Sequence, residues 1–269
     1  MRIPRIFFIL SLTFSFSLFN NIYAEVKVES QTLIVTEVPK DLGLNPFYKK
    51  YLDANGIPVV ASSNVRDEAF FAAKNIIVQM LSKRDDVRMA MITKPSRVMI
   101  IGEKEEVCDL PEYAGICNTP EKIKYWNRRA RGFGGDPESD CSSSCGEENL
   151  LKLAGDRYRG ENILVHEFAH LLHSVGLVGV DSDFNNKLQK LYDTAKTTGL
   201  WKRTYAMENK EEYFAETVQS FFNTNKYSAE PNGVHGPIDT RTKLKEYDPA
   251  IYNLLCEYFY DDREIFVNL

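Results

Sequence analysis

Histidine and cysteine are scarce in this chain, with four and five copies among 269 residues. No two Cys/His pairs stand at the spacing of a zinc finger, so a structural zinc site of that type is not expected. The basic residues form no stripe and the net charge is −5, which argues against a nucleic-acid-binding surface. Internal repeats and low-complexity linkers are absent as well.

Apolar runs long enough to cross a membrane are also missing. The stretch Ile6–Phe19 has 14 residues, whereas a span needs about 20. It follows Arg2 and Arg5 and precedes Ala24, a small residue at a plausible cleavage point, which is typical of a secretory signal peptide over residues 1–24. An uncleaved signal anchor is the alternative. We therefore expect a secreted protein, extracellular or periplasmic, without stable membrane insertion after cleavage.

Export permits disulfide bonds in the mature chain, whose net charge would be 31 − 38 = −7 after two arginines are removed. The natural local pairs are Cys108–Cys117 and Cys141–Cys145, each closing a short polar loop. Cys256 would remain as a buried free thiol in an apolar helical context. The spacing of Cys141 and Cys145 also allows a metal pair, which is less favoured because no second pair accompanies it. The connectivity stays open.

The pattern of apolar residues predicts a mixed front part and a mostly helical back part. Helices are expected at residues 66–83, 121–128, 160–174, 183–198, 209–223 and 248–260. Strands are expected at residues 33–35, 87–93 and 97–101. Residues 25–60 look extended and irregular, and residues 103–149 look like loops braced by disulfides. We predict a single α+β domain over residues 25–269, with one active-site cleft between its two parts.

The chemistry of the chain centres on His166-Glu167-Phe168-Ala169-His170. His166 and His170 are four residues apart, so a helix places both imidazoles on one face, where they can bind one Zn²⁺. Glu167 is turned about 100° from His166, so it can act as a general base on water without being a ligand. This HExxH pattern predicts one zinc ion per chain, two of its ligands and a catalytic base.

A catalytic zinc site needs a third protein ligand, and several candidates are open. The HExxHxxGxxH arrangement fails, because His173 stands where glycine is needed and Gly176 where histidine is needed. Asp181 and Asp183 follow the motif and could supply a carboxylate. A later predicted helix offers a further pair. Its two glutamates, Glu212 and Glu216, lie on one helical face, and spacing alone does not choose between them. One could bind the metal while the other hydrogen-bonds a histidine ligand.

The stretch Tyr205–Glu216, following His-Glu-Phe-Ala-His, resembles the catalytic domains of the lethal-factor-like and Pro-Pro endopeptidase family of gluzincin metallopeptidases. The resemblance covers roughly residues 160–223, about a quarter of the chain. It implies a zincin-like fold with His166, His170 and Glu212 as ligands and Glu167 as base. It further implies that Tyr205 stabilises the oxyanion or protonates the leaving group, and that Glu216 supports a ligand. The family's substrate preference is not transferred.

Three other features have weaker functional readings. His173, one turn after His170, is expected to line the cleft or bond a backbone carbonyl. His235 lies in a predicted loop and could approach the substrate. The glycine-rich Arg131–Gly135 lacks the context of a phosphate loop, and it could pair with an extended peptide as an edge strand.

We therefore predict a secreted zinc metallopeptidase that hydrolyses peptide bonds in peptide or protein substrates. Two alternatives belong to other classes. One is a zinc hydrolase of non-protein amides, and the other is a zincin-fold binding protein without turnover. The intact motif argues against the second, because a site without catalysis has no need of Glu167.

Overall fold

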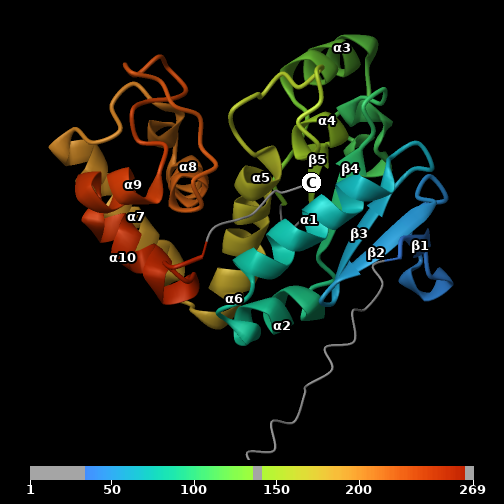
Figure 1. The fold of residues 1–269 in the computed structure, drawn as a ribbon, viewed down its shortest axis with the longest axis horizontal. Helices are drawn as coiled ribbons and strands as arrows, with labels where there is room; N and C mark the ends of the chain where they lie inside the picture. The colour runs from blue at the N-terminus through green and yellow to red at the C-terminus, as the bar shows by residue number, and fades with distance from the viewer. Residues whose placement is uncertain (1–33, 136–140, 264–269) are drawn as a thin grey trace, which may run out of the picture. The chain divides into compact units, whose positions relative to one another are not determined.

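The computed structural model describes residues 34–135 and 141–263, which belong to one compact unit. The predicted signal peptide at residues 1–24, and residues 25–33, lie outside the described residues. Within this unit the architecture is α+β, as the sequence predicts. Helices gather on one side, a five-stranded sheet with its own helices lies on the other, and helix α5 (Ile163–Leu171) runs between them (Figure 1).

The sheet has the strand order β1-β2-β3-β4-β5. The strands are β1 (Thr36–Glu37), β2 (Lys50–Ala54), β3 (Ile57–Ala61), β4 (Arg97–Ile101) and β5 (Ser142–Gly146). The first three are antiparallel, and β4 and β5 continue parallel to β3 with Val59 opposite Val98 and Val98 opposite Ser143. Among the described strands, β5 therefore occupies the edge that faces the helical part.

The hairpin of β2 and β3 lies in a region that the sequence analysis treated as irregular. Asn55 and Gly56 form its turn, and both have positive φ (55° and 92°). An Asn-Gly pair is the usual solution for such a tight hairpin. The predicted strand at residues 33–35 is displaced, because the pairing falls on Thr36–Glu37.

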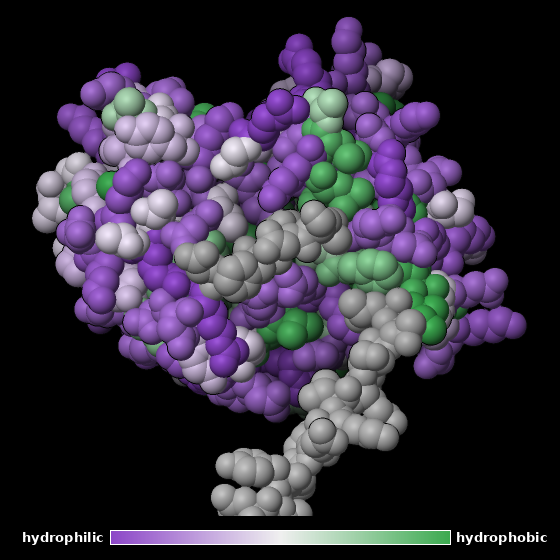
Figure 2. Space-filling model, in the orientation of Figure 1, coloured by the Kyte–Doolittle hydropathy of each residue, from purple (hydrophilic) through white to green (hydrophobic). Residues whose placement is uncertain are grey.

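Two layers of apolar side chains cover the faces of the sheet. Along β4, Val98 and Ile100 join the main core with helix α1, whereas Met99 and Ile101 join a smaller cluster on the opposite face. The alternation follows from the two-residue period of a strand. On the face shown in Figure 2 the coloured surface is mostly hydrophilic, in keeping with apolar side chains gathered inside.

The remaining elements are helices on both sides of the molecule. On the sheet side these are η1 (Lys40–Leu42), α1 (Asp67–Met80), α2 (Asp85–Thr93), η2 (Val107–Asp109), η3 (Pro111–Tyr113), α3 (Pro120–Arg129) and α4 (Glu147–Leu150). The others are α5 (Ile163–Leu171), the π-helical η4 (Leu172–Leu177), α6 (Val178–Val180), α7 (Phe184–Thr198), η5 (Tyr205–Met207), α8 (Lys210–Phe221), α9 (Arg241–Tyr247) and α10 (Pro249–Tyr258). The six predicted helices are all present.

Two predictions about the front part are wrong. Residues 87–93 form the helix α2 rather than a strand, with Val87 and Met91 buried and Met89 46% exposed, a pattern of helical period. Residues 103–149 contain the buried strand β5, which its serines concealed.

The cysteines follow the prediction in part. Cys108 and Cys117 form the expected disulfide, and Cys256 is a partly exposed free thiol. The Cys141–Cys145 pair is wrong, because Cys145 is a free and buried thiol inside β5. Four residues of extended chain span about 13 Å, whereas a disulfide needs Cα atoms within about 7 Å.

The prediction that no apolar run is long enough to cross a membrane is wrong for Ile163–Val180, which passes that test by length and composition. Within the protein, 67% of it is buried. Burial of this kind is the behaviour of a core helix, and this one carries the candidate site.

Candidate metal centre

Helix α5 holds the HExxH motif inside the protein. Asn162 caps its first turn, where its side chain accepts a hydrogen bond from the Val165 N–H at 3.1 Å. Phe168 and Leu171 are fully buried, and the helix packs against α8 on one side and β5 on the other. The helix is thus fixed from two directions, and its histidines cannot turn away from the cleft without unpacking the core.

Three donor atoms meet where α5 crosses α8. The Nε2 atom of His166 lies 3.0 Å from Glu212 Oε2 and 3.2 Å from His170 Nε2. The third distance among these atoms, from His170 Nε2 to Glu212 Oε2, is 3.3 Å. Ligands of a tetrahedral Zn²⁺ at 2.0–2.1 Å stand roughly 3.3–3.4 Å apart, so the three atoms have close to the separations that this ion requires.

Glu212 reaches the histidines from the first turn of α8. Asn209 caps that helix by accepting from the Glu212 N–H at 2.8 Å. Burial opposes ionisation of Glu212, but hydrogen bonds with His166 and His170 outweigh it and hold its pKa well below the usual range. Burial by itself would lower the pKa of His166. The hydrogen bond with Glu212 and the charges of nearby carboxylates have a larger effect and raise this pKa to about 10. The cluster therefore stabilises positive charge at its centre, which suits a metal cation.

Glu167 lies beside this cluster at the floor of the cleft. Burial raises the pKa of its carboxyl, while His166, His170 and a hydrogen bond from the Gly134 backbone act in the opposite direction. The carboxyl thus lines the same cleft as the three donors but lies outside their set.

Tyr205, in η5, approaches the cluster from the other side. Its hydroxyl donates to Glu212 Oε1 at 3.2 Å, and its ring stacks 6.4 Å from that of His166. Burial, followed by the charge of Glu212, raises its pKa to about 12. The Tyr205 N–H donates to the carbonyl of Val234 at 2.8 Å, so the loop around residue 234 helps to hold this side chain.

Gln219 is a site residue that the sequence analysis missed. Its Oε1 lies 2.9 Å from His166 Nδ1, whereas Glu216 Oε1 is 3.7 Å from the same nitrogen. Its amide nitrogen donates to the carbonyl of Asn162 at 3.1 Å. Gln219 follows Glu212 by seven residues and so lies on the same face of α8, a signal that could have identified it. Glu216 is buried and accepts from Asn225 at 3.1 Å.

The other candidate residues lie apart from the three donors. His173 contacts Asn185 Oδ1 at 2.8 Å and packs against Phe184. Asp181 pairs with Lys187 at 2.7 Å. Asp183 also lies outside the donor cluster; its side chain accepts from Asn186 at 2.8 Å. Neither aspartate is therefore positioned to complete the site.

His235 lines the cleft, with its Nε2 at 3.5 Å from Glu161 Oε1. Both side chains are largely buried. Because Val234 binds the Tyr205 backbone and His235 follows it, the Glu161–His235 contact ties the Tyr205 loop to the segment just before α5.

The cleft that holds these residues has a volume of about 790 Å³. One wall is the Arg131–Gly135 segment, which runs beside β5 and pairs with it: Ser144 N–H donates to the carbonyl of Phe133 at 2.9 Å. A Cβ atom at Gly134 would overlap the His170 ring, and one at Gly135 would overlap Leu171. The glycines therefore let this backbone run directly against the motif helix.

Comparison with known proteins gives a weak likeness to solved structures alone. No protein-family model matches the chain, and no curated protein matches its sequence. Among solved structures, the fold is similar to that of a Pro-Pro endopeptidase (PPEP-2) from Paenibacillus alvei, with a TM-score of 0.47 and 18% identity. The match covers 75% of this chain and 97% of that one. Membership of the family that the motifs suggest stays a prediction.

Proposed function

We propose that this protein is a secreted zinc-dependent endopeptidase. The observation that carries the proposal is the convergence of His166, His170 and Glu212 at the floor of a cleft, with an acid group and a phenol beside them. The signal-peptide pattern and the Cys108–Cys117 disulfide support export to an oxidising compartment. The proposed metal content is one Zn²⁺ per chain.

The donor set fits this ion, since two imidazoles and one carboxylate leave a fourth position open. Zn²⁺ bound there would polarise a peptide carbonyl and lower the pKa of water. Glu167 would take a proton from the attacking water and deliver it to the leaving amine. Its burial favours this exchange, because a carboxyl with a raised pKa can hold the proton between the two transfers.

Tyr205 would donate a hydrogen bond to the oxygen that becomes negative in the transition state. A phenol with a pKa of about 12 keeps its proton at neutral pH and can serve as a donor. Gln219 would hold the imidazole of His166 in the tautomer that leaves Nε2 available for the metal.

The decisive experiment is digestion of a peptide library by the mature protein, with and without a zinc chelator, read by mass spectrometry. We expect cleavage that stops on chelation and returns with zinc. Glu167→Gln should keep its zinc and lose turnover. Zinc binding without peptide cleavage would contradict the proposal; a test on non-protein amides would then separate a different hydrolase from a binding protein.

A further inference from the structure

Helix α3 is a basic and exposed element in an acidic protein. Four of its ten residues are Lys or Arg and one is Glu, whereas the whole chain has a net charge of −5. The helix contributes no fully buried residue, and Ile123 and Tyr125 on its surface are 39% and 50% exposed. Core packing accounts for Trp126, which packs against the smaller apolar cluster, but not for the exposed Ile123 and Tyr125.

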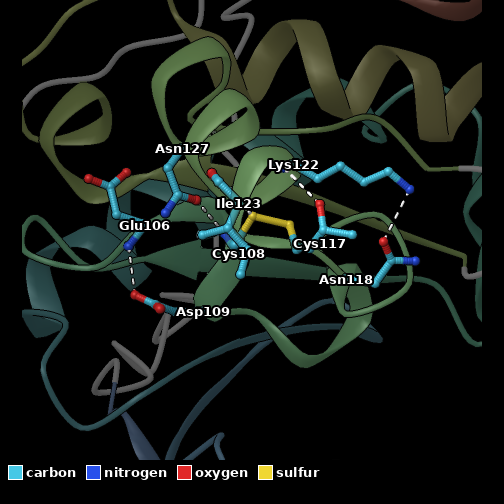
Figure 3. Close-up of a disulfide and its surroundings, with 9 residues drawn as sticks. Glu106, Cys108, Asp109, Cys117, Asn118, Lys122, Ile123 and Asn127 are labelled. Carbon is cyan, nitrogen blue, oxygen red and sulfur yellow. Dashed lines mark hydrogen bonds between the residues drawn. A yellow bond between two sulfur atoms is a disulfide. The ribbon is translucent and has the colours of Figure 1, made fainter.

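Despite its exposure, α3 is held firmly in place (Figure 3). The Cys108–Cys117 disulfide closes the loop before it, and the Cys108 N–H donates to Asn127 of α3 at 3.0 Å. Thr119 caps its first turn, accepting from the Lys122 N–H at 3.3 Å. At its other end the guanidinium of Arg157 donates to the carbonyls of residues 127, 128 and 130. The disulfide and these hydrogen bonds therefore hold α3 in place, although the helix has no fully buried side chain.

One face of α3 continues the wall of the cleft. Tyr125, Trp126 and Arg129 line it, and Trp126 packs edge-on against Phe133 at 5.3 Å between ring centroids. Lys122 stands one turn before Trp126, so the four residues follow the helical spacing i, i+3, i+4 and i+7 and share one face. This face, from Lys122 to Arg129, is called the α3 stripe: two cations with two aromatic rings between them.

Charges of both signs line the cleft. Glu161, Glu167, Glu211, Glu212 and Glu216 are acidic, and Arg131, Arg157 and Lys226 are basic. Arg129 of the α3 stripe adds a further positive charge to this lining. Among the described residues, no hydrogen bond or ion pair occupies the guanidinium of Arg129, and this side chain lines the cleft together with Tyr205. Arg129 therefore acts within the same cleft as the metal centre.

We propose that the α3 stripe recognises an acidic segment of the protein substrate as that segment leaves the cleft. This inference rests on the proposed peptidase function. Arg129 and Lys122 are seven helical residues apart, about 10 Å along the axis. An extended peptide covers that distance in about three residues. The recognised segment would carry two Asp or Glu residues two to four positions apart, with an apolar residue between them against Tyr125 and Trp126.

The test uses short fluorescent peptides in two pools, one containing Asp and Glu and one with Asn and Gln in their place. Binding to the mature protein is measured by fluorescence anisotropy. We expect the acidic pool to bind roughly tenfold more tightly at low salt, and the preference to shrink as salt is added, since both ion pairs are exposed. Lys122→Glu combined with Arg129→Glu should abolish the preference.

The control variant reverses the same number of charges on helix α7, by Lys190→Glu combined with Lys196→Glu. This variant should keep the preference for acidic peptides. In cleavage assays the α3 variant should raise KM for acidic peptides by a similar factor, and KM for the Asn/Gln pool should change little. Equal binding of acidic peptides by the wild type and the α3 variant would overturn the inference. Binding of single-stranded DNA to the α3 stripe as tightly as the acidic peptides would also overturn it. Fluorescence anisotropy measures binding and needs no turnover. Binding of acidic peptides without chelator-sensitive cleavage would therefore contradict the proposed peptidase function but support the recognition surface.

Discussion

At the residue scale, the candidate centre depends on side chains that orient the proposed ligands. Gln219 is the clearest case, since its contact with His166 Nδ1 at 2.9 Å selects the tautomer that exposes Nε2. Gln219→Ala should weaken zinc binding by about 10–100-fold without unfolding the protein. Zinc affinity is measured by competition with a chelating dye. Gln189→Ala, on the exposed surface of α7, is the matched control and should leave affinity unchanged.

Tyr205 is expected to affect turnover but not the binding of zinc or substrate. Its hydroxyl contacts Glu212 Oε1, yet Tyr205 is not among the three donors. Tyr205→Phe should lower kcat by roughly 10²–10³-fold, the usual loss for one oxyanion donor, while KM and zinc content stay near the wild-type values. Steady-state kinetics and metal analysis on the same sample test this. A large loss of zinc would instead assign Tyr205 a role in holding the ligand.

Glu161 makes stability depend on pH. Burial, and then the charge of Glu216, raises its pKa to about 7. A raised carboxyl pKa means that the folded state binds the proton more tightly, so this contribution is present below about pH 4.5 and is lost as pH rises through about 7.

In metal-free protein, Glu161→Gln should therefore flatten the fall in unfolding free energy between those two pH values, by at most about 3 kcal/mol. Urea denaturation at several pH values measures it. An unchanged profile would show that Glu161 titrates normally in the folded protein.

At the element scale, helix α3 depends on its disulfide for position. The bond closes a loop with a sequence separation of nine, so replacing both cysteines by serine should cost about 2–3 kcal/mol of stability. Hydrogen exchange should speed up in α3, which contributes no fully buried residue, and remain slow in α5. Hydrogen exchange monitored by mass spectrometry tests this prediction. Equally faster exchange in α3 and α5 would mean that the disulfide stabilises the whole fold rather than α3 alone.

Local patterns predicted the elements with long apolar faces and were wrong for α2 and β5. Helices α1, α5, α7, α8 and α10 each carry several buried side chains at helical spacing. The nine residues of α2 are too few to distinguish a helix from a strand by periodicity. Strand β5 is buried although it contains three serines, so its burial comes from its neighbours rather than from its own composition.

At the scale of the whole molecule, the proposed metal joins two helices that are distant in the sequence. His166 and His170 come from α5 and Glu212 from α8, so zinc would link two elements of the core. Chelation should lower the melting temperature, because ligand at 1,000 times its dissociation constant stabilises by about 4 kcal/mol. Differential scanning fluorimetry with and without chelator measures the shift. His166→Ala protein should melt at the same temperature in both conditions.

The sequence by itself determined the local part of the site. The i, i+4 spacing of His166 and His170 and the rotation of Glu167 follow from helix geometry, which needs only neighbouring residues. The tertiary structure decided the rest. It brought Glu212 rather than Glu216 to the two histidines and placed Gln219 behind His166. It also set α3 at the rim of the cleft. These contacts depend on how separate elements pack, and packing between distant segments leaves no fixed spacing in the chain.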